Sequence, residues 1–163
     1  MTLMRAATMT GALAMLLLLP ACERSPEDSD PHVTIEGHRW DVELATTNNE
    51  QFTGMGGRSE APTGTGMLFI FPDNAHRQFI MRACLIPLDI AFINSEGKIV
   101  AIHTMKVESD QRRLVRYPSY YPVNMALEVA GGEFDRLGIR VGHYVTFSKD
   151  TQRTIDNVTQ RGH

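Results

Sequence analysis

Apolar residues are densest between residues 66 and 102, where short apolar runs are separated by turn-forming residues. Residues 67–71 form a continuous apolar run, which is typical of a strand that is buried on both faces. Residues 88–94 and 98–105 flank the turn sequence Ser-Glu-Gly and predict a β-hairpin. This stretch therefore predicts the centre of a sheet.

The alternation continues on either side of this centre. Residues 32–45 alternate around a Glu-Gly-His turn and predict a second hairpin, in which Trp40 is a core anchor. Thr47 and Glu50 have the spacing of a capping box, which predicts a short helix with Phe52 pointing inward. Residues 132–137 predict one or two further helical turns. Together the patterns predict a mainly β (β-rich α+β), single compact domain: an antiparallel barrel-like or folded sheet of about eight to nine short strands with two short helices.

The first 21 residues are predicted to be an export signal. A single basic residue, Arg5, precedes an apolar run that is too short to span a bilayer as a helix. The run ends in Leu-Pro-Ala-Cys, which resembles the bacterial lipobox. This resemblance implies cleavage before Cys22 and lipidation of its thiol, which would anchor the protein to a membrane. Pro20 is tolerated in this motif but not favoured, and the alternative is an ordinary secreted protein in which Cys22 has no role.

The rest of the chain divides by composition. Residues 22–31 are polar and proline-containing, which predicts a disordered tether. Residues 32–148 form the predicted β domain, and residues 149–163 are predicted to be a polar, frayed tail. Because Glu23 follows the cysteine, in place of the aspartate that commonly marks inner-membrane retention, we expect the periplasmic face of the outer membrane in a Gram-negative cell. The formal net charge of −3, with no basic stripe, argues against a nucleic-acid partner.

The chemistry-bearing residues assemble into no strong catalytic motif. The chain has two cysteines, and if Cys22 is lipidated then Cys84 has no disulfide partner. Cys84 lies among apolar residues and is expected to be buried and inert. Its one plausible catalytic partner is His103, on a segment that could be a sheet neighbour. The methionines and histidines lack metal-ligand spacing, so we predict no metal and no cofactor.

Two groups of residues are candidates for ligand binding. Asp89 is an acid inside an apolar strand and needs a partner, for which Arg58 and Arg82 are the obvious choices. The trio is either a structural ion pair or an arginine-lined pocket for a carboxylate, sugar or phosphate. Tyr120 and Tyr121 lie in a proline-rich loop, where they either stay exposed for a sugar or protein contact or fold back over an open barrel end.

Several segments resemble, in order and spacing, the bacterial and archaeal family called domain of unknown function 192. The resemblance lies in the segments that match G-L-M-x-R, G-M-L-F-x-F, F-W-M-K-N-T-x-I-P-L-D-I-x-F, G-x-I, A-L-E and G-I-x-x-G-D, at residues 54–58, 66–71, 79–92, 97–99, 126–128 and 138–143. The chain departs from the pattern at Ile80, Ala83 and His143, and by Gly56-Gly57. The family has no established activity, so the resemblance implies fold rather than chemistry.

The sequence therefore predicts an envelope lipoprotein, most simply a non-enzymatic module that binds a small ligand, a glycan or a protein. The alternative is an envelope hydrolase or thiol-dependent enzyme that uses Cys84 and His103, and metal binding is the weaker third reading.

Overall fold

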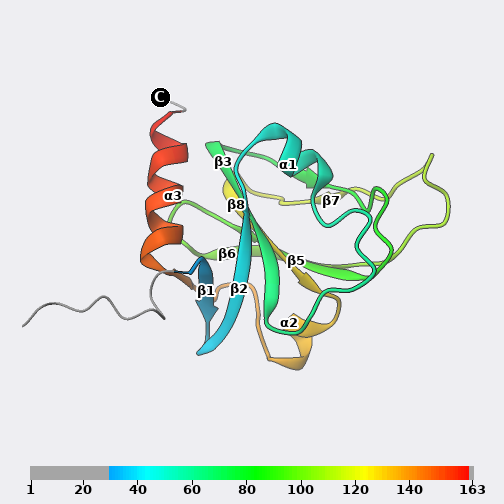
Figure 1. Cartoon of the computed structure of the whole chain (residues 1–163), viewed down its shortest axis with the longest axis horizontal. Helices are drawn as coiled ribbons and strands as arrows, with labels where there is room; N and C mark the ends of the chain where they lie inside the picture. The colour runs from blue at the N-terminus through cyan, green and yellow to red at the C-terminus, as the bar shows by residue number, and fades with distance from the viewer. Residues whose placement is uncertain (1–29, 162–163) are drawn as a thin grey trace, which may run out of the picture.

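The computed structural model describes residues 30–161 of the 163-residue chain, so the predicted signal peptide, Cys22 and nearly all of the tether lie outside the described residues. Within this part the chain forms nine strands and three short to medium helices (Figure 1). Their bounds are β1 (His32–Ile35), β2 (His38–Ala45), α1 (Asn48–Thr53), β3 (Thr65–Ala75), β4 (Gln78–Phe79), β5 (Leu88–Ile93), β6 (Ile99–Met105), β7 (Tyr117–Pro118), β8 (Val123–Ala130), α2 (Glu133–Arg136), β9 (Val145–Phe147) and α3 (Lys149–Gln160).

Seven strands form one sheet in the order β6-β5-β8-β3-β2-β1-β9, and β4 and β7 form a separate two-stranded ribbon. All neighbours in the large sheet are antiparallel except β2 and β3, which are parallel. The sheet curls, because a bridge between Lys98 and Tyr144 links the segment before β6 to the segment before β9. The result is a curled half-barrel, which confirms the predicted mainly β fold.

Both faces of the central strands are buried. On β8, Leu127 belongs to an apolar cluster on one face with Trp40 and Phe134, while Ala126 belongs to a cluster on the opposite face with Phe69. We call these the first face and the second face. The helices α2 and α3 contribute to the first face, whereas the segment after α1 and the region of β4 and β7 cover the second. The prediction that residues 67–71 are buried on both faces is confirmed.

Local signals in the sequence account for the first hairpin and the first helix. Glu36 and Gly37 both have positive φ angles, as expected of a tight two-residue turn between β1 and β2. The capping box forms, since the Glu50 amide donates to Thr47 Oγ1 and Glu50 Oε2 accepts from the Thr47 amide. Phe52, predicted to point inward, is instead 68% exposed. It lies at the mouth of the pocket described below, where a cation covers its ring.

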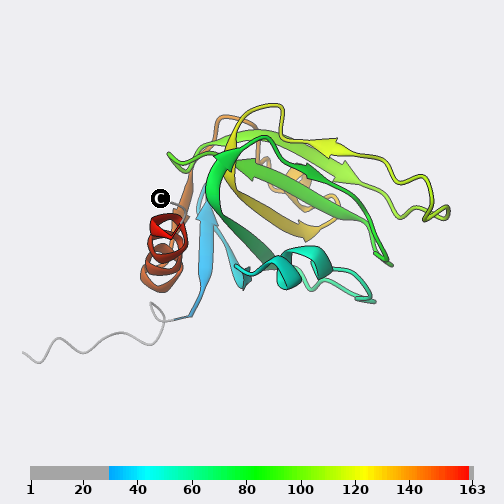
Figure 2. The same cartoon turned by 90° about the horizontal axis from the view of Figure 1, so that it is seen from above.

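The C-terminal segment differs from the prediction. The expected frayed tail is a 12-residue helix, α3, which is capped by Ser148 and stands beside the sheet on the side away from α1 (Figures 1 and 2). Thr151 and Ile155 are buried, and Ile155 joins the apolar cluster of the first face. Polar composition concealed the pattern because only one face of the helix needs to be apolar. No helix in the described residues is long and apolar enough to cross a membrane.

Candidate functional site

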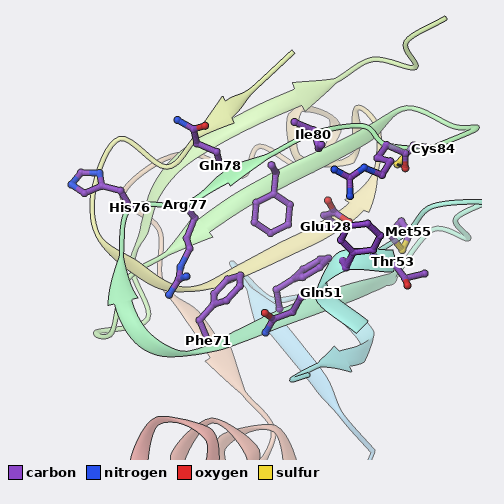
Figure 3. Close-up of a pocket in the computed structure, with 15 residues that line it drawn as sticks. Gln51, Thr53, Met55, Phe71, His76, Arg77, Gln78, Ile80, Cys84 and Glu128 are labelled. Atoms are coloured by element: carbon purple, nitrogen blue, oxygen red, sulfur yellow. Dashed lines mark hydrogen bonds between the residues drawn. The ribbon is translucent and has the colours of Figure 1, made fainter. Parts of the chain in front are cut away.

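The second face of the sheet is incompletely covered, and a pocket of about 440 Å³ remains there. This volume is within the range of about 300–1,000 Å³ that is usual for small-molecule sites. The wall comes from α1 and the turn after it, from β3, and from residues 76–84 (Figure 3). The lining residues are Gln51, Phe52, Thr53, Gly54, Met55, Phe69, Phe71, His76, Arg77, Gln78, Phe79, Ile80, Arg82, Cys84 and Glu128.

Glu128 is the acid of this pocket. It lies on β8 between Met67 of β3 and Ile90 of β5, so its position in the middle of the sheet is set by strand pairing on both sides. The residue is only 5% exposed. Figure 3 shows its carboxyl between the segment carrying Thr53 and the one carrying Cys84, while Arg77 lies at the other end of the pocket.

The Glu128 carboxyl has no hydrogen-bond partner within residues 30–161. Burial raises its pKa to about 8, and the charge of Arg58 acts against this shift without cancelling it. Glu128 is therefore mostly protonated at neutral pH and presents a hydroxyl that can donate a hydrogen bond as well as accept one. An acid whose pKa is displaced this far in a pocket is a candidate functional group.

Arg58 is held beside the site by a different acid from the one predicted. Its guanidinium forms a two-pronged pair with the Glu43 carboxylate, in which one of the contacts is 2.8 Å. This hydrogen bonding lowers the pKa of Glu43. Arg58 is not among the residues that line the pocket, although its charge reaches Glu128.

Asp89 faces the opposite side of the sheet. Its neighbours Leu88 and Ile90 belong to the second face, so the period of two along β5 directs Asp89 to the first. There its Oδ2 accepts a hydrogen bond of 3.0 Å from the Phe134 amide at the start of α2. The predicted pairing of Asp89 with Arg58 or Arg82 is wrong: the partner is a helix end, and Oδ1 has no hydrogen bond within the described residues.

Two arginines line the pocket and each covers an aromatic ring. The Arg82 guanidinium lies 4.4 Å from the centre of the Phe52 ring, and the Arg77 guanidinium lies 4.2 Å from that of Phe71. Arg77 also pairs with Asp73. Arg82 has no acidic partner within residues 30–161. Arg82 therefore brings an uncompensated positive charge to the pocket.

Cys84 and His103 do not form a hydrogen-bonded pair. The Cys84 thiol contacts the Arg82 carbonyl oxygen at 3.6 Å, and a His103 ring nitrogen lies 2.8 Å from the Pro118 carbonyl oxygen. Burial raises the pKa of Cys84 to about 11, and the charge of Glu128 adds to the shift. The thiolate needed for nucleophilic attack is thus scarce at neutral pH. No group of three or more His, Cys, Asp or Glu in the described part of the chain is placed to hold a metal ion.

The two tyrosines lie outside the pocket. Tyr120 is 63% exposed and Tyr121 is 60% exposed, in the loop between β7 and β8. The Tyr120 ring rests 5.6 Å from that of His103. Of the five residues predicted to bind a ligand, only Arg82 lines the pocket. Cys84, which the alternative hypothesis of a thiol-dependent enzyme uses, also lines it.

Sequence reasoning did not single out Glu128, although the signal was present. Glu128 is an acid within an apolar strand, the same observation that selected Asp89. One of the departures from the family pattern also falls here, and a second, Ala83, is close to it in the chain. Ile80 lines the pocket where the pattern has tryptophan. Ala83, where the pattern has asparagine, has a φ of 52°, in the left-handed region that asparagine tolerates better than alanine.

Comparisons with known proteins identify the family and the fold. The family model of domain of unknown function 192, described as "Uncharacterized ACR", matches residues 31–147. A crystal structure of a proposed transcription regulator from Sinorhizobium meliloti 1021 is similar with a TM-score of 0.67 and 29% identity, covering 73% of this chain and 94% of that chain. A protein of unknown function from Novosphingobium aromaticivorans DSM 12444 has a TM-score of 0.66 and 34% identity, covering 71% and 83%. No curated protein matches.

The pKa of Glu128 predicts a pH-dependent stability. The folded pKa of about 8 exceeds the ordinary glutamate pKa of 4.5, so the folded state holds the proton more tightly and stability falls as pH rises from 4.5 to 8. At about 1.4 kcal/mol per pKa unit, the full loss is up to about 5 kcal/mol. Glu128→Gln removes this loss. Urea unfolding should find the variant as stable as wild type near pH 4.5 and more stable at pH 8.

Glu60→Gln is the matched control, because Glu60 is exposed. It should follow the wild-type pH profile. If Glu128→Gln also follows that profile between pH 4.5 and 8, the carboxyl is ionised in the folded protein and its assignment as a neutral donor is wrong.

The raised pKa of Cys84 predicts slow alkylation. At pH 8 a thiol with a pKa of about 11 holds about 100-fold less thiolate than one with the ordinary cysteine pKa of 9.0. Iodoacetamide should therefore modify Cys84 about 100-fold more slowly than free cysteine. Peptide mass spectrometry measures the modification at this residue. Unfolding in urea should restore the ordinary rate. A folded protein that reacts at pH 7 faster than free cysteine would instead support the thiol-dependent enzyme.

Proposed function

The chain belongs to the family of domain of unknown function 192, and we propose that it is a non-enzymatic binding module of the cell envelope that holds a small ligand in the pocket over Glu128. One observation carries this proposal: a buried carboxyl without a hydrogen-bond partner lies in an open pocket whose wall includes four phenylalanine rings. Burying such a group without a partner costs free energy. A ligand that supplies the partner would recover part of that cost.

The pocket favours binding over the alternative thiol chemistry. Cys84 is protonated at neutral pH, and His103, which would have to act as its base, is already bound to a backbone carbonyl. Nucleophilic catalysis requires a base within hydrogen-bond reach of the nucleophile, and Cys84 and His103 form no such pair. Phe69 and Phe79 meet edge to face at 4.9 Å between ring centres and give the pocket an apolar wall suited to holding a ligand.

The anchor is part of the proposal. Lipidation of Cys22 would hold the domain at a membrane, on the periplasmic side of the outer membrane if the source is Gram-negative. The tether would let it reach at most about 30 Å from the lipid, at roughly 3.3–3.6 Å per residue. Such a position suits capture of small solutes or a contact with a glycan or another envelope protein, for which the exposed Tyr120 and Tyr121 are candidate contacts.

The anchor predicts a change of fractionation. Cys22→Ala removes the thiol that carries the lipid, so the protein should leave the membrane pellet and appear in the soluble fraction. Cys84→Ala is the matched control and should stay in the pellet, because Cys84 is buried in the domain. Immunoblots of separated fractions measure both. Retention in the membrane of a Cys22→Ala chain that has lost its signal peptide would contradict lipid anchoring.

The pocket predicts a bound small molecule in the protein from its own cell. Native mass spectrometry of the full-length chain, purified from its source without chelator, should find an adduct whose mass identifies the ligand. Ile80→Trp should reduce the adduct, because Ile80 lines the pocket and the larger ring fills it. Val107→Trp is the control, at an exposed position outside the pocket.

An adduct that survives in Ile80→Trp would place the ligand elsewhere. A wild-type chain without any adduct, which also gains no thermal stability from a collection of small envelope solutes, would contradict the binding function.

A further inference from the structure

Two polar groups at one end of the pocket complement each other. Gly54 has no side chain, and a Cβ atom built at this position would lie 3.8 Å from Oε2 of Glu128. The Glu128 carboxyl therefore faces the turn that follows α1. Phe52, two residues earlier, carries the Arg82 guanidinium over its ring. The buried carboxyl and the guanidinium therefore belong to the same end, and neither has an acidic or hydrogen-bonding partner in the described chain.

We propose, on the basis of the binding function above, that the ligand is a small carboxylate with an apolar body, whose carboxylate is held between the Glu128 carboxyl and the Arg82 guanidinium. Glu128 donates its hydroxyl proton to one ligand oxygen as a hydrogen bond, and Arg82 presents N–H groups to the carboxylate. The planar guanidinium fork matches a carboxylate in shape and charge.

The walls define the rest of the ligand. Phe69, Phe71 and Phe79 line the pocket. The Phe79 ring meets that of Phe69 edge to face at 4.9 Å between centres and that of Phe71 at 6.4 Å. An aromatic or acyl body lies against them and removes apolar surface from water. Arg77 at the far end is paired with Asp73, so that end offers less net charge than the end with Arg82.

The alternatives in charge fit less well. A cationic ligand would meet Arg82 and the field of Arg58, while Glu128, the acid that lines the pocket, is protonated at neutral pH. A doubly charged phosphate would bring two negative charges next to a carboxyl that burial already keeps neutral. A monoanionic carboxylate needs one donor and one cation, which is the set that this end provides.

The donor role of Glu128 makes binding depend on pH. The charged and titratable groups around the carboxyl are Arg58 and Cys84, with Arg82 in the same pocket. His76 and Arg77 also line the pocket, at the end away from Glu128 (Figure 3). The arginines keep their charge throughout. Cys84 has a pKa of about 11, so among the groups around the carboxyl it is Glu128 that changes below pH 10. Above its pKa of about 8 the ionised carboxylate repels the ligand and no longer donates.

The test uses three probes that share one phenyl body: 3-phenylpropionate, which is an anion, 3-phenylpropanamide, which is neutral, and 3-phenylpropylamine, which is a cation. NMR of the full-length protein with labelled methionine methyl groups reports binding at Met55, which lines the pocket, with Met125 on the first face as an internal reference. At pH 6.5 the carboxylate should bind at least about tenfold more tightly than either other probe. Hexanoate in the same assay distinguishes an acyl body from an aromatic one.

Two variants test the two contacts. Arg82→Gln should weaken binding of 3-phenylpropionate about fivefold, the upper size expected when an exposed charge pair is lost. Arg112→Gln, at an exposed arginine outside the pocket, should leave the affinity unchanged. Between pH 6.5 and pH 9.5 the wild type should lose roughly thirtyfold in affinity, since pH 9.5 lies about 1.5 units above the pKa of Glu128. Glu128→Gln keeps a donor that does not ionise, so its affinity should change less than about twofold.

The outcomes separate this inference from the binding function. Equal or tighter binding of the amide or the amine at Met55, or an Arg82→Gln variant that binds like wild type, overturns the carboxylate assignment and leaves the pocket as a ligand site. If none of the three probes and no hexanoate binds at Met55, and native mass spectrometry finds no adduct, the carboxylate assignment and the binding function are both contradicted.

Discussion

The structure depends on one constraint: the central strands are apolar on both faces, so the sheet must be covered twice. Leu127 and Ala126 are adjacent on β8 and are both fully buried, one on each face. On the first face the curl of the sheet, α2 and α3 complete the cover. On the second face the cover comes from irregular segments around α1, β4 and β7, which close less completely. The pocket exists because segments held by few backbone hydrogen bonds cover an apolar sheet face.

Two buried acids on this sheet illustrate how position decides chemistry. Asp89 and Glu128 both lie in apolar strands, and both are at most 5% exposed. Asp89 accepts a hydrogen bond from a backbone amide of α2, so its carboxyl satisfies a free N–H group at the start of that helix. Glu128 receives no hydrogen bond within the described residues, and desolvation consequently decides its protonation state. The same residue class is thus structural on one face and available to a ligand on the other.

The sequence was informative wherever the signal is local. The apolar run at 67–71, the turn at Glu36-Gly37 and the capping box of Thr47 and Glu50 depend on neighbours within a few residues, and all were correctly predicted. The α3 helix also had a local signal, because Thr151, Ile155 and Val158 recur at helical spacing after the capping residue Ser148. The polar composition of the segment conceals this periodicity, because only one face of the helix is apolar.

The parts that could not be predicted depend on long-range pairing. Whether Asp89 or Glu128 faces the arginines depends on which face of the sheet each acid occupies, and the order of strands decides which elements cover that face. Similarly, Arg58 pairs with Glu43, fifteen residues earlier in the chain, because the fold brings β2 next to the turn after α1. A sequence pattern can identify a buried acid, but the geometry of the cover determines whether that acid is satisfied by the protein or left to a ligand. That is why the carboxyl without a partner, and not the predicted ion pair, identifies the candidate site.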